Sequence, residues 1–568
     1  MEILSLWRSP LDKVALSEAQ ALSDRQPRGS TFGEDFSPLT IYNYGYYVTN
    51  ATGHDPNTAL TNMFQAMSSP ASLPYSIPAG VGGTAFIPQG SFQVTASSSG
   101  FSVPDQCNVI GSGGGGPSTG GGASNFFHFI VSPPAGETAP STFLNCDFAH
   151  TCGGKFFRNL AFEWGTTTYA DICISTASGN AWNTRAINCT FTNCPVAFNA
   201  SGLSCGMEQC TVQYNTGPAG NGPTGSGAFA SVVLGGSQCY IAGPGEYLQP
   251  TQAGITPPST NPPTDTCCIS FQSGLEHGIV SDLHISHFSY GITYGINSHN
   301  TIFHCVITNV EFSVFNTCVY MQPSDSHGTI YDQKYIGCVF SLENDSTQTS
   351  SLVYVSAIGG SVNDVQFVGC TTYQGLGHGY EFKSGSNIQI VGGTSSGNGP
   401  SGGAGIAITG NASPCTFIGV NLDASYPDAS NVQSQNYAFV CSGNPTKAVL
   451  LDGCPMLGYS TSPVSITGSP ADLIITNCPG YNDLNTVIAP TAPLSTVTAA
   501  SASLITGGTN YYGPSLLIFT NGASPVTFTM NSVASTVPAN AFVVMYLPSP
   551  NDEFLFSSAP AHFTWLGK

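Results

Sequence analysis

The chain has 568 residues, of which 7% are charged, and it carries 66 Gly, 39 Pro and a formal net charge of −20 at pH 7. So few charges among so many turn-forming residues predict a stacked, turn-dense β architecture and disfavour a helical one. The negative charge disfavours nucleic acid and anionic membranes as partners. It also disfavours strongly acidic polymers, unless a local basic groove or bound cations intervene. No apolar run is long enough to cross a bilayer, so membrane insertion is not expected.

Residues 1–40 differ in composition from the rest of the chain. Residues 11–22 predict a short amphipathic helix, and four of the 11 Lys and Arg lie before residue 29. We interpret this basic leader as an attachment peptide that docks onto another protein; the alternative is a disordered tail without a role. The opening residues lack the charged start and apolar core of a secretory signal, so we expect folding in a cytosol.

Residues 41–111 predict a cap followed by the first coils of a stacked structure. Asp55 is suited to cap a helix at 56–67, which begins with Pro and carries an apolar stripe. The segments 82–92 (Gly-Gly-Thr-Ala-Phe-Ile-Pro-Gln-Gly-Ser-Phe) and 108–111 (Asn-Val-Ile-Gly) then predict the first strands.

Residues 112–482 are predicted to form the body of the stacked structure, and from about 159 to 482 one short phrase keeps returning. It joins apolar residues to one Asn, Asp or Gly, and after residue 282 it recurs about every 23 to 34 residues. Alternation predicts strands, and Asn, Asp and Gly best accept a left-handed bend. We therefore predict a parallel β-helix from about 85 to 482; a large β-sandwich is the alternative. The phrase stands at 158–162, 187–191, 281–285, 308–312, 336–340, 368–372, 391–394, 418–422, 452–455 and 476–479.

The order of strand, Asp-capped helix, Gly-Gly-Thr-x-Phe-Ile-Pro-x-Gly-x-Phe and Val-Ile-Gly resembles the start of the pectate-lyase-like β-helix family, in the form found in bacteriophage tailspikes. The resemblance covers about 41–482 and is specific for fold, not for activity. It implies a right-handed parallel β-helix closed by a capping helix, and usually a homotrimer. It also implies a place in the virion tail after synthesis and assembly in the cytoplasm of a bacterial host.

After residue 482 the repeat stops. Residues 483–495 predict a linker. Residues 496–568 predict an antiparallel, sandwich-like β domain, with strands at 515–519, 525–529, 542–546 and 553–556. A terminal domain of this kind, reached through Pro-Gly-Tyr-Asn at 479–482 and ending in a Trp motif, also resembles phage tail proteins.

The chain has 19 Cys, and several stand at one phase of the repeat. That phase points inward, where a free thiol behaves as a small apolar group, so we predict a buried ladder of reduced thiols. Its members are Cys189, Cys338, Cys370, Cys454 and Cys478. The Cys spacings match no zinc pattern, and we expect neither a bound metal nor a cofactor.

Titratable residues gather between 276 and 332. Aligning the phrases puts His284 and Glu311 in one outward column on successive coils, with Thr190 before them and Val339 after them. Glycoside hydrolysis needs two carboxyls, about 5–5.5 Å apart for retention or 6.5–9.5 Å apart for inversion. We therefore predict Glu311 with Asp325 or Asp332 as catalytic carboxyls, within one chain or across subunits, and His284 beside them. The candidates next in line are Glu163, Glu343 and Glu381.

The same region offers groups that suit a sugar. The predicted carbohydrate-binding residues are Tyr290, Tyr320, Tyr331, Tyr373 and Glu276, although each Tyr is as easily a core residue. A calcium-dependent lyase is disfavoured, because no Lys or Arg of the coil region stands beside an Asp cluster in the sequence. Solvated, non-catalytic side chains remain an alternative for every one of these residues.

Three hypotheses follow. The first is a phage tailspike that binds a host surface polysaccharide, lipopolysaccharide or capsule, and depolymerises it, by hydrolysis rather than by lyase chemistry. It would attach to tail or adaptor proteins through its N-terminus. The second is a spike of the same fold that binds its receptor without cleaving it, and the third is a free-standing polysaccharide lyase or hydrolase.

Overall fold

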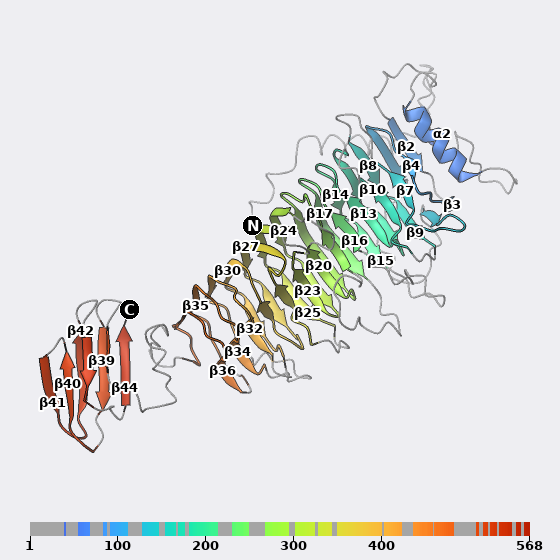
Figure 1. The fold of residues 1–568 in the computed structure, drawn as a ribbon. Helices are drawn as coiled ribbons and strands as arrows, with labels where there is room; N and C mark the ends of the chain where they lie inside the picture. The colour runs from blue at the N-terminus through green and yellow to red at the C-terminus, as the bar shows by residue number, and fades with distance from the viewer. Residues whose placement is uncertain are drawn as a thin grey trace, which may run out of the picture. The chain divides into compact units, whose positions relative to one another are not determined.

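The structure is a computed structural model. It describes residues 39–40, 55–68, 83–87, 91–111, 128–146, 154–165, 169–176, 181–213, 230–248, 267–294, 301–323, 328–343, 349–399, 403–422, 435–457, 459, 461–481, 507–509, 515–520, 523–530, 533–547, 553–557 and 562–567. The predicted leader helix at 11–22 and the linker at 483–495 lie outside these ranges. The described chain winds in parallel coils, each stacked on the one before, which confirms the parallel β-helix (Figure 1). The predicted domain boundaries stay predictions.

Most coils contribute strands to two parallel sheets, here called sheet A and sheet B. The main strands of sheet A are β2 (Gly83–Ile87), β5 (Cys107–Gly111), β8 (Lys155–Arg158), β11 (Thr184–Ile187), β14 (Gly206–Glu208), β17 (Tyr240–Leu248), β19 (Ile279–Ser286), β21 (Thr301–Thr308), β24 (Gly328–Ile336), β27 (Gly360–Val368), β30 (Ser386–Val391), β33 (Cys415–Ile418), β35 (Ala448–Asp452) and β37 (Asp472–Thr476). A two-residue strand, β1 (Leu39–Thr40), pairs with β2.

Further strands of sheet A follow the main strands in many coils. They are β3 (Ser91–Thr95), β6 (His128–Ser132), β9 (Ala161–Trp164), β12 (Thr190–Thr192), β15 (Thr211–Gln213), β22 (Glu311–Val314), β25 (Val339–Leu342), β28 (Thr371–Tyr373) and β31 (Thr394–Ser396). Sheet B consists of β4 (Phe101–Ser102), β7 (Thr142–Asn145), β10 (Ile172–Ser175), β13 (Val196–Ala200), β16 (Ala230–Leu234), β18 (Cys267–Phe271), β20 (Tyr290–Tyr294), β23 (Thr317–Met321), β26 (Val353–Val355), β29 (Tyr380–Phe382), β32 (Ala404–Ile408), β34 (Tyr437–Cys441) and β36 (Ser462–Ile466).

The polar residue of the repeated phrase bends the backbone at the end of each main strand of sheet A. Its φ is positive in every phrase, at Asn159, Asn188, Asp282, Asn309, Gly337, Gly369, Gly392, Gly419, Gly453 and Asn477. These are residue types that accept a left-handed backbone with little strain. The bend residues also join the coils through their side chains: Asn188 Nδ2 donates to Asn159 Oδ1 at 2.8 Å, and Asn309 Nδ2 donates to Asp282 Oδ1 at 3.2 Å.

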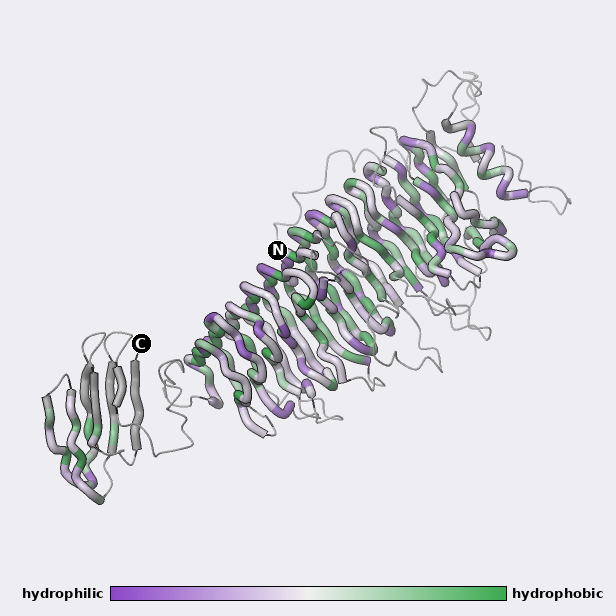
Figure 2. Tube along the Cα trace, in the orientation of Figure 1, coloured by the Kyte–Doolittle hydropathy of each residue, from purple (hydrophilic) through white to green (hydrophobic). Residues whose placement is uncertain are grey.

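Inward side chains stack from coil to coil and form the core. Phe162 stacks on Phe191, with ring centroids 5.1 Å apart, and Tyr335 stacks on Phe367 at 5.0 Å. Hydrophobic stretches recur in this way along the whole β-helix (Figure 2). All five cysteines of the predicted ladder are buried and free, which confirms that prediction. Burial raises the pKa of Cys305, another core thiol, to about 12, so it stays protonated.

The predicted capping helix is present as α2 (Pro56–Ser68). Asp55 accepts hydrogen bonds from the backbone N–H groups of Asn57 and Thr58, at 3.0 and 3.3 Å, and so satisfies donors that have no partner within the helix. Asn57 Oδ1 in turn accepts from the N–H of Thr95 on β3, at 2.8 Å, and fixes the helix to the first coils. Leu60, with its neighbours along the apolar stripe, is buried.

The C-terminal strands form two antiparallel sheets, as the sequence predicted. One sheet has the order β38-β43-β40-β41 and the other β42-β39-β44. Phe519 of the second sheet packs edge-on against Phe556 of the first, with ring centroids 4.7 Å apart, so the sheets share a core. The strands are β38 (Gly507–Thr509), β39 (Ser515–Thr520), β40 (Val526–Met530), β41 (Val533–Val537), β42 (Phe542–Leu547), β43 (Glu553–Phe556) and β44 (His562–Gly567).

The bend at Asn309 allows a direct test of backbone strain, because its φ is 52°. Asn309→Ala and Asn309→Gly both lose the hydrogen bond to Asp282, but only Ala keeps a Cβ that the left-handed backbone disfavours. We expect the Ala variant to be less stable than the Gly variant by about 1 kcal/mol, measured by denaturant or thermal unfolding. An Ala variant as stable as the Gly variant would contradict this explanation of the repeat.

Candidate functional site

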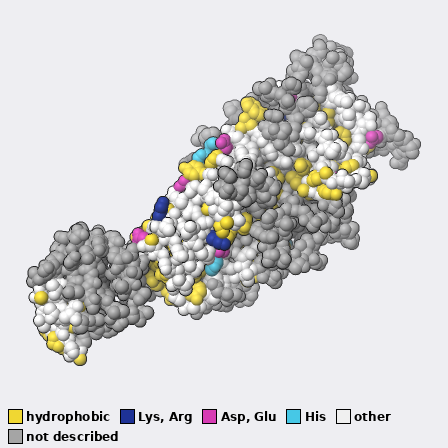
Figure 3. Space-filling model, viewed as in Figure 1, with side chains coloured by type: hydrophobic (Ala, Val, Ile, Leu, Met, Phe, Trp, Pro, Cys, Tyr) yellow, Lys and Arg dark blue, Asp and Glu magenta, His cyan; other side chains and the backbone are white. Residues whose placement is uncertain are grey.

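A second column of left-handed residues runs along part of sheet A, and in most of the phrases between 187 and 394 it lies five residues before the bend. Its members are Asn183, Ser204, Gln238, His277, His304, Asp332, Asp364 and Asn387, with φ between 50° and 58°. All are polar, and we call this set the polar column. Because neighbouring strands lie about 4.8 Å apart, its members can contact one another from coil to coil. On the face shown in Figure 3 charged side chains are few; His, acidic and basic groups follow one edge of the β-helix, and a smaller group lies toward its middle.

The centre of the polar column holds an Asp–His–Lys cluster. Asp332 Oδ2 lies 2.8 Å from His304 Nδ1, and Asp332 Oδ1 lies 3.2 Å from Lys334 Nζ. The hydrogen bond from His304, followed by that from Lys334, holds the pKa of Asp332 below its usual range, so this carboxylate is an acceptor. His304 Nδ1 therefore carries a proton, and in the neutral ring the lone pair lies on Nε2. The side chains of His304 and Lys334 are 44% and 40% exposed.

Aromatic rings surround this cluster. His277 stacks on His304, with centroids 5.1 Å apart, and the ring of Tyr331 stands edge-on to His304 at 5.7 Å and 86°. Tyr331 also contacts Phe303 edge-on, at 6.4 Å, and is 38% exposed. Glu276 is exposed and pairs in register with Phe303 through an isolated bridge. Aromatic rings with a few polar groups beside them are a common lining of ligand-binding surfaces.

A buried polar network lies beneath the cluster. Gln333, which follows Asp332, is fully buried, and its amide donates to the carbonyl oxygen of Tyr331 at 2.7 Å. Its Oε1 accepts from the hydroxyl of Tyr294, which is 2.6 Å from the hydroxyl of Tyr335. Buried polar groups cost free energy unless their hydrogen bonds are satisfied, and satisfied networks rigidify their surroundings. This network therefore fixes the backbone that presents Tyr331 and Asp332.

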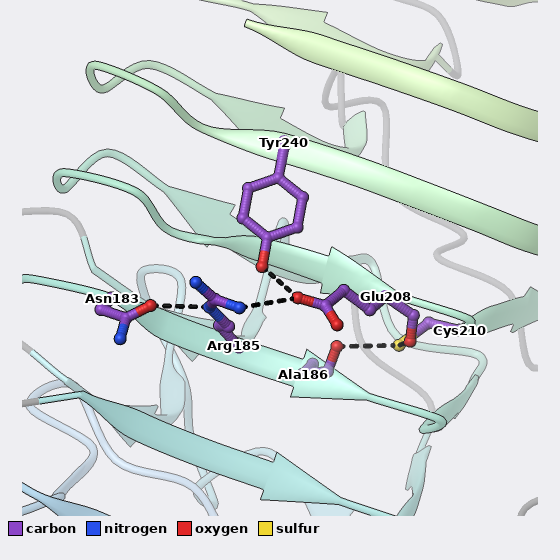
Figure 4. A network of polar contacts seen from close by, with 6 residues as sticks. All are labelled: Asn183, Arg185, Ala186, Glu208, Cys210 and Tyr240. Carbon is purple, nitrogen blue, oxygen red and sulfur yellow. Dashed lines mark hydrogen bonds and ion pairs between the residues drawn. The ribbon is translucent and has the colours of Figure 1, made fainter. Parts of the chain in front are cut away.

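A second polar network lies on β11, β14 and β17 of the same sheet (Figure 4). Arg185 donates to Glu208 at 3.1 Å and to Asn183 Oδ1 at 2.6 Å, and its guanidinium lies over the ring of Tyr240 at 5.6 Å. The Tyr240 hydroxyl donates to Glu208. Burial, and then the charge of Glu208, raise the pKa of Tyr240, so the phenol keeps its proton. The charges in this network compensate one another, which is typical of a structural contact.

The structure confirms the register that the sequence predicted for His284 and Glu311. His284 pairs with Glu311, and Glu311 pairs with Val339. The sequence alignment missed two members, because Thr211 and Glu246 stand between Thr190 and His284 in the same column. The irregularity between Ala242 and Gly245 hides Glu246 from an alignment of phrases.

The predicted catalytic residues fall into two groups. Glu311 is exposed and lies in the column of Val339, on β22 and β25. Asp332 lies on β24, seven residues before Val339 in the chain and on the other side of the bend at Gly337, and it pairs with His304 and Lys334. The structure therefore places Glu311 and Asp332 in different columns of sheet A. Asp325 lies outside the described residues.

The predicted sugar-binding tyrosines differ in exposure. Tyr290 is 4% exposed, and its hydroxyl accepts from Asn316 at 2.7 Å, so its ring is not offered to a ligand. Tyr320 is half-buried and stacks on Tyr354, with centroids 5.2 Å apart. Tyr373 is half-buried on β28. Of the four, only Tyr331 joins the cluster around Asp332.

The remaining carboxyl candidates lie elsewhere. Glu343 is 3.4 Å from His287 Nδ1. Glu381, on sheet B, accepts from Ser351 at 2.7 Å and from Thr409 at 2.8 Å. Glu163 pairs in register with Thr192. In the part of the chain that the structure describes, no group of three or more His, Cys, Asp or Glu is placed to hold a metal ion. The helix among the described residues is too short to cross a membrane.

No family model and no curated protein sequence matches this chain. Solved structures match its fold. A mutant tailspike protein of E. coli bacteriophage HK620 aligns over 97% of this chain and 100% of its own, with 9% identity and a TM-score of 0.52. Tailspike protein 3 of bacteriophage CBA120 covers 83% of this chain and 69% of its own, with 11% identity and a TM-score of 0.43.

A third match is the A-module of a mannuronan C-5 epimerase from Azotobacter vinelandii. It covers 76% of this chain and 97% of its own, with 9% identity and a TM-score of 0.35. At such identities the likeness establishes the fold alone. The chain is a parallel β-helix of the kind found in phage tailspikes.

The lowered pKa of Asp332 predicts a pH-dependent contribution to stability. Its charged form is favoured in the folded state, so the contribution is present above the ordinary carboxyl pKa and is lost as the pH falls through the lowered pKa. We expect Asp332→Asn, which tolerates the same backbone, to cost less than about 1 kcal/mol at neutral pH because the pair is partly exposed. Unfolding measured from neutral to acidic pH should show this difference vanishing; a constant difference would contradict the ion pairs.

Proposed function

We propose that this protein is a phage tail spike that binds a polysaccharide of the host cell surface and cleaves its internal glycosidic linkages. The cluster of His304, Asp332 and Lys334 beside the exposed ring of Tyr331 carries the proposal. Titratable groups and an exposed aromatic ring lie side by side there, and binding and cleaving a sugar polymer requires both kinds of group. The β-helix fold, which phage tailspikes share, supports the same function. Lipopolysaccharide and capsule are the two sources of such a polymer.

Hydrolysis by two carboxyls, which the sequence favoured, requires a partner for Glu311, and the described chain places Asp332 in another column. In a homotrimer a neighbouring copy would supply that second carboxyl. Hydrolysis at Glu311 therefore stays a prediction that depends on assembly.

Cleavage is tested by incubating the purified protein with a panel of bacterial capsular polysaccharides and lipopolysaccharides. We expect new reducing ends on at least one polymer, together with a fall in its average chain length, because internal cleavage produces both. Heat-unfolded protein is the control. Saturable binding to a polymer without any new reducing end would establish a receptor-binding spike that does not cleave.

The leader at 1–40 is proposed to join the spike to tail or adaptor proteins. A chain without residues 1–30 should keep the thermal unfolding of the β-helix and its binding to polysaccharide, since both depend on the coils. It should no longer be incorporated into virus particles assembled in the host cytoplasm. Particles that carry the truncated chain at the normal level would show that the leader is not the anchor.

A further inference from the structure

A pocket of about 360 Å³ lies where successive strands of sheet B end. Its lining residues follow β26, β29, β32 and β34, in the turns that lead from these strands to the next ones. In a parallel stack the same turn of each coil lies about 4.8 Å from that of the coil before, so four coils contribute to one pocket. None of its lining residues belongs to the Asp–His–Lys cluster, so the pocket is a separate site.

Two glycines keep side chains out of part of the pocket wall. A Cβ atom at Gly410 would lie 2.0 Å from the carbonyl oxygen of Lys383, and one at Gly443 would lie 1.8 Å from the carbonyl oxygen of Gly410. Atoms cannot approach so closely, so only glycine fits at either position. The wall there consists of backbone, and no side chain can fill the space.

The polar side chains of the pocket present hydrogen-bond donors, because backbone N–H groups occupy their acceptor atoms. Ser384 Oγ accepts from the N–H of Ala357 at 2.6 Å, and Asn444 Oδ1 accepts from the N–H of Ser469 at 2.8 Å. These bonds orient the hydroxyl proton of Ser384 and the amide protons of Asn444 away from the backbone that each side chain binds. A ligand in the pocket therefore meets donors and is favoured when it carries acceptors.

Lys383 gives the pocket a positive charge. Of the described residues that line it, only Lys383 is charged, and its side chain is exposed. The carboxylate of Glu381, two residues earlier, accepts hydrogen bonds from Ser351 and Thr409, at 2.7 and 2.8 Å. Lys334, in contrast, lies 3.2 Å from an Asp carboxylate. The ammonium of Lys383 and the donors beside it form a site for an anionic group.

We propose that this pocket binds a phosphate ester group carried by a glycan of the host surface. The inference rests on the proposed function for the source of the ligand. Phosphate oxygens accept hydrogen bonds in several directions, so they can bind an ammonium, a hydroxyl and an amide at once. Lys acts on phosphate as a point charge, whereas the planar fork of Arg fits a carboxylate better.

The size and the rim of the pocket suit a phosphate that is attached to a carbon skeleton. A phosphate group alone does not fill about 360 Å³, and Ile358, which lines the pocket and is 50% exposed, offers the skeleton an apolar contact. The net charge of −20 repels polyanions at long range. Binding therefore depends on this local contact and favours a polymer with few phosphate groups.

The site is tested with two matched pairs of probes. The full chain is titrated with sn-glycerol 3-phosphate and with glycerol, and its binding to phosphorylated and to unmodified dextran is measured. We expect the phosphate-bearing member of each pair to bind more tightly, and this advantage to shrink as salt screens the charge. Tighter binding of phosphorylated dextran than of sn-glycerol 3-phosphate, compared per phosphate group, would support a polymer as the carrier. Equal binding would overturn the glycan and leave a site for small phosphate esters.

Two variants test the donors. Lys383→Met should weaken binding of both phosphate probes about 10–100-fold, because hydrogen bonds to charged groups are the strong ones. Asn444→Asp keeps the acceptor for the N–H of Ser469 but replaces the amide donors by a negative charge, so it should also weaken binding. Lys447→Met is the matched control, since Lys447 is exposed and does not line the pocket. Thermal unfolding should be alike in all three variants.

Two results would overturn the phosphate site. One is equal binding of phosphorylated and unmodified dextran, and the other is equal loss of binding in Lys383→Met and Lys447→Met. The polysaccharide panel separates this inference from the proposed function. Cleavage of a polymer by a chain that binds no phosphate probe would overturn the pocket and leave the depolymerase intact. Phosphate binding that Lys383→Met removes, without cleavage of any polymer, would support the pocket and overturn the depolymerase.

Discussion

The structure depends on a backbone constraint that returns in most of the described coils, the left-handed conformation at fixed positions of sheet A. An L-residue with a bulky side chain pays roughly 1–2 kcal/mol there, so Gly, Asn, Asp and His take most of these positions. The constraint therefore determines which side chains stand at these surface positions, and most of those that are not Gly are polar. Where Asn or Asp occupies the bend, side chains hydrogen-bond from coil to coil, as Asn188 does with Asn159. Where His and Asp occupy the polar column, as at His304 and Asp332, the same stacking creates an Asp–His pair.

Much of the fold was predictable, because the same constraint selects Asn, Asp or Gly at regularly spaced positions of the sequence. The bend residue of each phrase, the alternation around it and the Asp-capped helix each follow from local chemistry, and the register of His284 with Glu311 followed from aligning phrases. Glu246 was missed because an irregular strand shifts its position relative to the phrase. The burial of Tyr290 was not predictable, since an outward side chain of a β-helix is covered or exposed according to distant contacts.

The candidate site was only partly predictable, for a related reason. The phrase marks one bend per coil, and the polar column lies five residues before it, where the residue type varies from Ser and Gln to His and Asp. Reading the sequence at that fixed offset would have aligned His277, His304 and Asp332. The density of titratable residues directed attention to the region of Asp332 and Tyr331, where the structure has Tyr331 and Asp332 both in contact with His304. It also joined Glu311 to them, although Glu311 belongs to a different column.

The buried network beneath the Asp–His–Lys cluster indicates that the polar column does more than turn the backbone at the solvent-exposed surface. Gln333 occupies a core position that apolar residues fill in neighbouring coils, such as Val365 on β27 and Cys305 on β21. A buried amide costs free energy unless its hydrogen bonds are satisfied; here the Tyr294 hydroxyl donates to the Oε1 of Gln333 inside the core, and the amide nitrogen donates to the carbonyl oxygen of Tyr331. Stability alone favours an aliphatic side chain at this position. The presence of Gln at this core position is explained by its hydrogen bond to the carbonyl oxygen of Tyr331. That bond fixes the backbone that carries the exposed Tyr331 ring and the left-handed Asp332 after it. The core of this one coil is therefore adapted to the surface that it carries.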